Sequence, residues 1–444
     1  MPAFHIWTLG CQMNRADSLK LAAGLERLGY SEAGDDGASD LIVINTCSVR
    51  QHAEDRAYSR LGVLRKRRER GEQFKLAVMG CMVGPKTDEL ERRFPWVDAW
   101  ARPQEFDPII ELAGRSDLGR DVSEGEFWTE TFGVPEGVTA FVPVVHGCDK
   151  FCTFCIVPFR RGRERSRPVA EVLAEVRHLA AHGVREVTLL GQTVEAYGRD
   201  LDSDGQAGER PDGRADLATL FEAIERIDGI VRTRFLTSYP RDMTDRIIGA
   251  VADLPKVCEH FNLPVQSGDD TVLERMRRGY TLAEYEERVQ RIRGRMPHAA
   301  IATDVIVGFP GETDEQFANT IALLERLQFD VIHAAAYSER PGTYATRNQP
   351  DDVPLEVKKA RLQAVEAVHA DSASRINRRL IGERVEVLVE REEDGRSTGR
   401  TRGGQLVHFA ETGLVGELAE VIVDSVTPWS LQGRAADDVA LAVV

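Results

Sequence analysis

A short cysteine-rich segment constrains this chain more than any other part of its sequence. Cys148, Cys152 and Cys155 follow one another in a C-x3-C-x2-C spacing. This spacing places three thiolates on one loop, close enough to bind a single inorganic cluster. A 4Fe-4S cluster normally takes four thiolates, so three would leave one iron open to a substrate or a cofactor. The segment therefore predicts a catalytic iron-sulfur site.

Two other interpretations of the same cysteines remain open. A structural zinc ion normally has four protein ligands, and His146 stands close enough in the sequence to complete such a set. Alternatively, the three cysteines are buried side chains without a ligand. Phe151 and Phe154 lie inside the loop, and aromatic residues in a solvent-facing loop need a reason for burial. Shielding of a cluster supplies that reason.

Length and composition set the broad class of the protein. With 444 residues, 42% hydrophobic and 29% charged, the chain is typical of a soluble protein with two or three domains. No apolar run approaches the roughly 20 residues that span a bilayer, and no secretory signal is recognisable. We expect a cytoplasmic enzyme with no membrane partner. Its seven cysteines are then better explained as metal or redox ligands than as disulfides, with Cys258 left over in the core.

The amino-terminal region predicts a parallel sheet. Residues 4–8, 40–45 and 75–79 have the character of strands, and residues 17–28 have helical periodicity. Alternating strands and helices favour a doubly wound α/β fold, with helices on both faces of the sheet.

Each of these three strands runs into a cysteine. Cys11, Cys47 and Cys81 are about one strand-helix unit apart, as parallel connections require. We therefore expect the three thiolates to lie along the edge formed by the carboxyl ends of the strands, where open α/β sheets bind ligands. A single cysteine there would most simply be a packed side chain, but three at equivalent positions favour a second cluster.

The middle of the chain predicts a partial barrel. Residues 114–139 are rich in Gly, Glu and Ser and indicate a linker. The strands expected after it are residues 140–145, 186–190, 232–236, 261–263, 302–307 and 331–336. The helices expected between them are residues 169–181, 217–227, 285–292 and 315–327. Six strands in this order predict a partial (βα)6 barrel, with its chemistry at the carboxyl ends of the strands.

The last region predicts a small β-barrel. Residues 385–389 and 418–422 are short strands separated by the Gly- and Arg-rich residues 399–404. A small β-domain used for dimerisation would show the same pattern.

Together these segments resemble the methylthiotransferases of the radical S-adenosylmethionine (SAM) superfamily. The resemblance runs through nearly the whole chain and is carried by residues 8–14, 45–50, 79–82, 147–158 and 161–167. Residues 399–401 and 429–433 resemble the TRAM domain, an RNA-binding barrel. The resemblance implies three domains: an amino-terminal methylthiotransferase domain (1–120), a radical SAM core (134–372) and a TRAM domain (373–436).

The resemblance also implies cofactors and their ligands. Cys148, Cys152 and Cys155 would hold the 4Fe-4S cluster that binds and cleaves SAM, whereas Cys11, Cys47 and Cys81 would hold an auxiliary 4Fe-4S cluster. The residues expected around SAM are Phe151, Phe154, Gln192, Gln266, Ser267, Val307 and Gly308. Glu195 and Tyr239 differ from the residues common at these positions in the tRNA enzymes, which bears on the modified adenosine that is accepted.

The function implied is methylthiolation of tRNA at carbon 2 of N6-isopentenyladenosine beside the anticodon. Its partners would be the anticodon stem-loop, SAM and an electron donor such as flavodoxin or ferredoxin. The nearest alternative is the related enzyme that modifies an aspartate of a ribosomal protein, followed by one that acts on threonylcarbamoyladenosine in tRNA. An iron-sulfur protein of RNA binding or electron transfer is the non-enzymatic alternative, although four cysteines per cluster would be expected there.

Charge bears on the RNA partner. The net charge of −15 argues against non-specific nucleic-acid binding by the whole chain. Local basic clusters at residues 65–70, 160–167, 275–278 and 375–379 would follow a phosphate backbone if they shared a face. Each cluster alone is better explained as a solvated helix face or loop.

Overall fold

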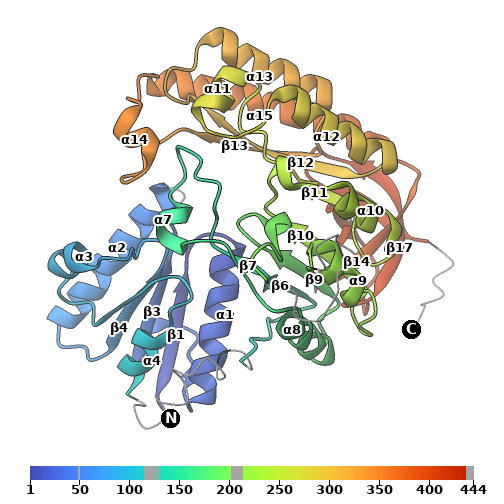
Figure 1. Cartoon of the computed structure of the whole chain (residues 1–444). Helices are drawn as coiled ribbons and strands as arrows, with labels where there is room; N and C mark the ends of the chain where they lie inside the picture. Colours follow the sequence, from blue (N-terminus) through green and yellow to red (C-terminus); the bar gives the residue numbers. More distant parts are fainter. Residues whose placement is uncertain (49–50, 115–127, 129–130, 202–213, 437–444) are drawn as a thin grey trace. The chain divides into compact units, whose positions relative to one another are not determined.

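The computed structural model in Figure 1 describes residues 1–48, 51–114, 128, 131–201 and 214–436. Most of the expected linker at residues 114–139 lies outside them. The chain forms two compact units. One consists of Met1–Pro135, Phe141–Phe151 and Cys155–Leu179, and the other of Glu136–Ala140, Cys152–Phe154 and Ala180–Val444. The chain therefore passes between the units within the cysteine loop itself.

The first unit contains the predicted parallel sheet. Its strands are β1 (Ala3–Thr8), β2 (Ser31–Glu32), β3 (Leu41–Thr46), β4 (Lys75–Gly80) and β5 (Ala99–Ala101). They are hydrogen-bonded in the order β2-β1-β3-β4-β5, and all four pairs are parallel. This is a doubly wound order, in which the direction of the winding reverses between β1 and β3.

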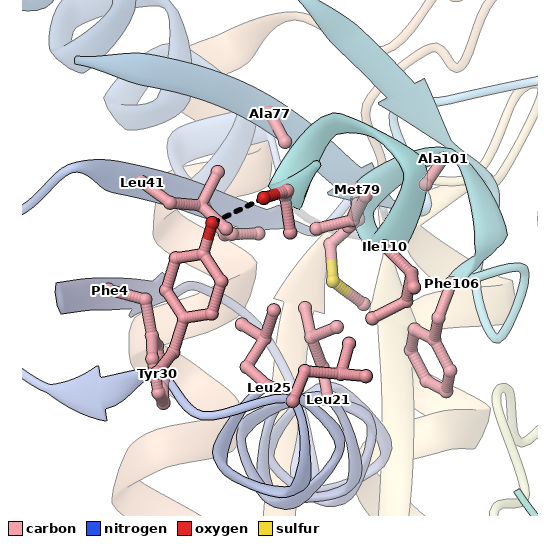
Figure 2. Close-up of a cluster of buried hydrophobic side chains, with 14 residues drawn as sticks. Phe4, Leu21, Leu25, Tyr30, Leu41, Ala77, Met79, Ala101, Phe106 and Ile110 are labelled. Carbon is pink, nitrogen blue, oxygen red and sulfur yellow. Dashed lines mark hydrogen bonds between the residues drawn. The ribbon is translucent and has the colours of Figure 1, made fainter. Parts of the chain in front are cut away.

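Helices cover both faces of this sheet. On one face, α1 (Gln12–Arg27) and α4 (Asp107–Ala113) enclose a core that Figure 2 shows, where Leu21 and Leu25 pack with Phe4. The Tyr30 hydroxyl donates to the Ala113 carbonyl oxygen at 2.6 Å and joins the ends of the two helices. On the other face, α2 (Gln51–Glu69) and α3 (Asp88–Arg93) cover a second core. Successive strand residues alternate between the two cores, which explains the continuous apolar character of the strands.

Helix α1 begins at Gln12, before the predicted start at residue 17. The sequence gives no apolar periodicity there because Asn14 and Asp17 are polar residues that are buried. A helix that starts directly after Cys11 fixes the position of that cysteine at the end of β1.

The second unit contains most of the six-stranded α/β region. Its strands are β6 (Thr139–Pro143), which continues into the first unit, β9 (Glu186–Leu190), β10 (Arg232–Leu236), β11 (His260–Asn262), β12 (Ala300–Val307) and β13 (Val331–Ala336). They form two three-stranded sheets in the orders β10-β9-β6 and β11-β12-β13. The predicted class of repeated strand-helix units is confirmed.

One predicted strand, residues 140–145, is wrong in detail. The structure divides it into β6 and β7 (Val145–His146), and β7 pairs antiparallel with β8 (Arg165–Ser166). Pro143 ends β6 because it has no N–H to donate to a neighbouring strand.

The remaining helices connect these strands. They are α7 (Val157–Arg161), α8 (Val169–Ala181), α9 (Leu217–Ile224), α10 (Asp245–Asp253), α11 (Asp270–Arg275), α12 (Leu282–Arg295), α13 (Asp314–Leu327), α14 (Tyr344–Asn348) and α15 (Leu355–Arg378), with 3-10 turns at η1 (Asp36–Ala38), η2 (Val194–Ala196) and η3 (Pro240–Asp242). Helix α15 escapes prediction because Lys358 and Arg361, which are buried, interrupt its apolar stripe. Within the described residues, no helix combines the length and apolar composition needed to cross a bilayer.

The carboxy-terminal strands close into the predicted small barrel. They are β14 (Arg384–Glu393), β15 (Arg396–Thr401), β16 (Leu406–Phe409), β17 (Leu418–Val426) and β18 (Leu431–Ala435), joined in the order β14-β15-β16-β18-β17. Residues 399–401 belong to β15, so the expectation that residues 399–404 only separate strands is wrong. Their Gly and Thr content indicates a turn in the sequence, but cross-strand pairing with β14 overrides it.

Buried arginines join this barrel to β10 within the second unit. Arg232 has no exposed surface and donates to Glu386 Oε1 at 2.7 Å and to the Arg400 carbonyl at 2.6 Å. Arg234 donates to the carbonyls of Thr401 and Arg402 at 2.7 and 2.8 Å. A buried guanidinium is costly unless its donors are satisfied, so these contacts fix the barrel in place.

Replacement of Glu386 by Ala tests this attachment. The change leaves the buried Arg232 charge with carbonyl partners only, and we expect it to lower the free energy of unfolding by about 3 kcal/mol. Glu420→Ala is the matched control because Glu420 faces Glu386 on β17 and is exposed; its effect should stay within about 0.5 kcal/mol. Anaerobic urea unfolding measures both, and equal effects would contradict the account.

Candidate iron-sulfur sites

The first candidate site lies at the carboxyl ends of three neighbouring strands in the first unit. Cys11 follows β1, Cys47 follows β3 and Cys81 follows β4. Cys47 and Cys81 are 3% exposed, whereas Cys11 is exposed. The winding of the sheet reverses between β1 and β3, and ligands of open α/β sheets bind at this point. The structure therefore brings the three cysteines to one sheet edge, as the sequence predicts.

The backbone around the cysteines allows a close approach. Gly10 has a φ of +119°, and a Cβ atom on it would lie 2.7 Å from Cys47 Cβ. Any side chain at residue 10 would thus separate the ends of β1 and β3. Asn14 holds the same two ends together, because its Nδ2 donates to Asn45 Oδ1 and to the Thr46 carbonyl, both at 2.8 Å.

A buried arginine lies against these sulfurs. Arg161 pairs with Asp17 at 3.1 Å, and the side chains of both are at most 3% exposed. Burial raises the pKa of the Cys81 thiol, and the positive charge of Arg161 nearby opposes the shift. Three thiols can bind the irons of a cluster as thiolates, and a guanidinium beside them offsets part of the negative charge of the thiolates, so the residues fit an iron-sulfur cluster.

Within the first unit, the second candidate site begins at Cys148. This cysteine is 8% exposed, and its amide donates to the Gly162 carbonyl at 3.1 Å. Asp149 pairs with Arg163 at 2.5 Å, and this hydrogen bond lowers the pKa of the Asp149 carboxyl. The loop is thus tied to the segment after α7.

Within the second unit, the centre of the loop is held by a separate set of contacts. The Thr153 amide donates to the Met276 carbonyl at 3.0 Å, and the Thr153 carbonyl accepts from Ala345 at 2.8 Å. Phe154 packs against Phe309, with ring centroids 6.3 Å apart. Phe154 thus packs within the protein, and its expected role in shielding a cluster stays a prediction. By contrast, Phe151 is 43% exposed, and its place at the cofactor remains a prediction.

Three arginines from two basic clusters of the sequence do not lie free on the surface. Arg161 and Arg167 are buried in the first unit and pair with carboxylates. Arg278 is buried in the second unit, where its Nη1 lies 3.2 Å from Cys152 Sγ. The interpretation of these arginines as phosphate ligands is wrong, because their side chains satisfy buried groups of the protein itself.

Among the residues expected at SAM, Gln266 and Ser267 have features that suit ligand binding. Gln266 has a φ of +71°, a strained conformation that is concentrated at functional sites. Ser267 is fully buried, and its hydroxyl has no hydrogen-bond partner among the described residues. An orphaned hydroxyl at a strand end suits a bound ligand. Gln192 follows β9 and is half-buried.

Val307 and Gly308 end β12. Val307 is fully buried. Gly308 has a φ of +67°, and a Cβ atom on it would clash with the Lys358 side chain. Its amide donates to Glu312 Oε2 at 2.5 Å. Packing on Lys358 alone requires glycine here, and contact with the adenine of SAM remains a prediction.

The single-zinc interpretation receives no support. Among the described residues, no three His, Cys, Asp or Glu side chains converge closely enough to hold one metal ion. A four-iron cluster binds one thiolate per iron and therefore requires sulfurs that are farther apart. His146 Nδ1 is hydrogen-bonded to Gln104. All seven cysteines lie in the described part of the chain, and none forms a disulfide there.

Sequence reasoning missed a buried carboxyl group at the end of β9. Glu195 is 4% exposed, and its Oε2 accepts from the Tyr239 amide at 3.1 Å. Burial raises its pKa to about 7, although the nearby Ser238 hydroxyl and the hydrogen bond from the Tyr239 amide oppose the shift. Asp242 nearby adds to it. The departure of Glu195 from the common residue type was the only signal in the sequence.

The raised pKa predicts a pH-dependent cost. Below pH 4.5 Glu195 is protonated in both states. Between pH 4.5 and about 7, Glu195 ionises in the unfolded chain but stays protonated in the folded protein. The free energy of unfolding therefore falls by roughly 3 kcal/mol, the equivalent of the pKa shift. Glu195→Gln removes this cost and keeps an oxygen for Tyr239. We expect its urea midpoint to exceed that of the parent at pH 8 and to match it near pH 4.5; an equal gain at both pH values would contradict the assignment.

Three family models match the chain. Residues 3–102 match the uncharacterized protein family UPF0004, residues 142–324 the radical SAM superfamily and residues 378–436 the TRAM domain. The matches follow the order of regions that the sequence predicts, while the exact boundaries at residues 120, 134 and 373 remain predictions.

Curated relatives match over nearly the full length. A protein of Dehalococcoides mccartyi (strain CBDB1), named tRNA-2-methylthio-N(6)-dimethylallyladenosine synthase, is 42% identical over 437 residues, which are 98% of both chains. A protein of the same name from Chloroflexus aurantiacus is 42% identical over 97% of this chain and 91% of its own. Among solved structures, the radical SAM methyltransferase TsrM from Kitasatospora setae has a TM-score of 0.54 at 16% identity, covering 78% of this chain and 77% of its own. That likeness shows the fold.

Proposed function

The chain belongs to the methylthiotransferases of the radical SAM superfamily, and on this premise we propose that it methylthiolates carbon 2 of N6-isopentenyladenosine beside the anticodon of tRNA. Membership of the family implies SAM and 4Fe-4S clusters as cofactors. The one observation that carries the proposal is the pairing of two three-cysteine sets, of which one lies at the switch point of the first sheet.

The two cysteine sets have separate roles in this proposal. When bound, the clusters and SAM supply the radical and sulfur chemistry that side chains lack, since the aromatic C–H bond is too weakly acidic for protein bases. Cys148, Cys152 and Cys155 hold the cluster that binds SAM. Cys11, Cys47 and Cys81 would hold the auxiliary cluster, which would supply the sulfur. Asn14 and Arg161 fix the auxiliary set by the contacts described above.

The reaction needs an electron, an RNA substrate and a compartment. We propose flavodoxin or ferredoxin as the electron donor and the cytoplasm as the location. TRAM is an RNA-binding type of domain, and the names of the relatives specify tRNA. We propose the anticodon stem-loop as the part of the tRNA that binds. The ribosomal-protein enzyme remains the second candidate only through its shared domains, because both relatives reported above carry the name of the tRNA enzyme.

One face of the carboxy-terminal barrel suits RNA phosphates. Arg391 pairs with Thr398, Thr398 with His408 and His408 with Gln432 across neighbouring strands, and Arg396 lies two residues before Thr398 on β15. Arg391, Arg396, His408 and Gln432 are here called the cationic strip. Arg396 Nη2 donates to Gln432 Oε1 at 2.6 Å. Burial lowers the pKa of His408, and Arg396 and Arg391 lower it further. By contrast, Arg402 pairs with Glu259 and serves the attachment of the barrel.

Separate loss of the auxiliary cysteines tests the division of roles. In Cys11→Ala, Cys47→Ala, Cys81→Ala we expect no methylthiolated nucleoside, while SAM is still cleaved to 5′-deoxyadenosine at a rate within about threefold of the parent. Nucleoside mass spectrometry and chromatography of the SAM products measure the two outcomes. Loss of SAM cleavage with the other cluster intact would show that the roles are not divided. A parent enzyme that modifies a ribosomal protein and no tRNA would move the assignment to the second candidate.

Neutralising the cationic strip tests its contact with RNA. Arg391→Ala with Arg396→Ala should weaken tRNA binding and reduce the slope of log K against log salt by about 1 to 2, roughly one for each phosphate contact. Arg291→Ala with Arg295→Ala, two exposed arginines of α12, serves as the control and should leave the slope unchanged. Anaerobic binding titrations at several salt concentrations compare them. These point changes avoid deletion of the barrel, which would uncover Arg232 and Arg234.

A further inference from the structure

One buried arginine in the second unit faces a cysteine of the loop. Arg278 follows α11 and is 5% exposed. Its three nitrogens all donate: Nε to Tyr280 Oη at 3.0 Å, Nη2 to the Pro264 carbonyl at 3.1 Å and Nη1 to Cys152 Sγ at 3.2 Å. The guanidinium plane is thereby fixed with one edge on the sulfur.

Two tyrosines hold this guanidinium in place. The carbon at its centre lies 4.8 Å from the ring centroid of Tyr239 and 5.3 Å from that of Tyr280. The Tyr239 hydroxyl donates to the Arg278 carbonyl, and the Tyr280 hydroxyl donates to the Pro264 carbonyl at 2.9 Å. These contacts leave the guanidinium few alternative positions. Only the edge that faces Cys152 is left for a partner of opposite charge.

That partner has to be negative. Taking a guanidinium out of water costs several kcal/mol unless an anion or several acceptors compensate for it. Among the ion pairs of the described residues, none includes Arg278. The two phenols stay neutral, because burial raises the pKa of both Tyr239 and Tyr280. A Cys152 thiolate, as a cluster ligand, is the one group in contact that supplies the charge.

The first unit offers a contrast. At the other cysteine set the guanidinium of Arg161 is already paired with the Asp17 carboxylate, so its charge is largely neutralised. The charge of Arg278 has no such carboxylate. The guanidinium at the auxiliary cysteines is therefore paired with a carboxylate, whereas the guanidinium at Cys152 is not.

We propose that Arg278 is a positioning residue that holds Cys152 at the SAM-binding cluster and raises the reduction potential of that cluster. The inference rests on the proposed function for the presence of the cluster. Hydrogen bonds to ligand sulfurs and local positive charge set such potentials. A fixed cation stabilises the additional electron, so a one-electron donor of the flavodoxin or ferredoxin class reduces the cluster more completely.

The experiment is an anaerobic redox titration of the holoenzyme followed by electron paramagnetic resonance. The signal that changes when SAM is added identifies the cluster on Cys148, Cys152 and Cys155. In Arg278→Gln we expect the ratio of reduced to oxidised cluster at a given potential to fall about tenfold, which equals a midpoint lower by about 59 mV for one electron. The signal of the auxiliary cluster should keep its midpoint.

Two further variants separate charge from fold. Arg278→Lys retains the positive charge. At a given potential, its ratio of reduced to oxidised cluster should stay within about twofold of that of the parent. Arg232→Gln removes an equally buried arginine that bonds to Glu386, and it should leave both midpoints unchanged even if the protein is less stable.

Each outcome is decisive. An unchanged midpoint in Arg278→Gln with full iron content overturns the proposal. If Arg278→Gln holds no SAM-responsive cluster, restoration of both cluster and midpoint by Arg278→Lys supports the proposal, and failure to restore them overturns it. A lowered midpoint in an enzyme that modifies no tRNA would leave this inference standing and overturn the proposed function instead.

Discussion

Convergence of parallel strand ends is the constraint on which the auxiliary site depends. In the order β2-β1-β3-β4-β5 the strands β1, β3 and β4 are direct neighbours, so cysteines one strand-helix unit apart in sequence meet at one edge. The reversal of winding between β1 and β3 leaves this edge uncovered by a crossover helix. Gly10 then allows the first two strand ends to approach. The set formed by Cys148, Cys152 and Cys155 needs no such fold, because its three members share one loop.

Buried guanidinium groups are a second feature that recurs in the structure. Arg161 faces the auxiliary cysteines, Arg278 faces Cys152, and Arg232 attaches the carboxy-terminal barrel to β10. A chain with net charge −15 thus places several of its arginines inside. Arginine suits this use because its planar fork satisfies several acceptors at once and remains charged when buried. Consequently, fewer arginines are free on the surface than the sequence suggests.

Much of the fold could be predicted, because strand periodicity is a local signal. The spacing of Cys11, Cys47 and Cys81 likewise predicted their place at one sheet edge, while their role as cluster ligands stays a prediction. Strands β9, β10 and β13 have the predicted bounds. The long-range contacts were not predictable: Arg278 reads as part of a basic run, and the Cys152 sulfur it contacts is 126 residues away in the chain. Because buried polar residues interrupt the apolar periodicity, the start of α1 and the whole of α15 could not be predicted either. Pairing with β14 turned the apparent turn at residues 399–401 into strand.

The central claim is that the sheet edge at Cys11, Cys47 and Cys81 holds its own cluster. The most direct test is Mössbauer spectroscopy with iron and sulfide analysis of the anaerobically reconstituted Cys148→Ala, Cys152→Ala, Cys155→Ala variant. The account predicts one 4Fe-4S cluster, with about half the iron of the parent protein. A folded variant that binds no iron would contradict it, since the six cysteines would then serve a single site.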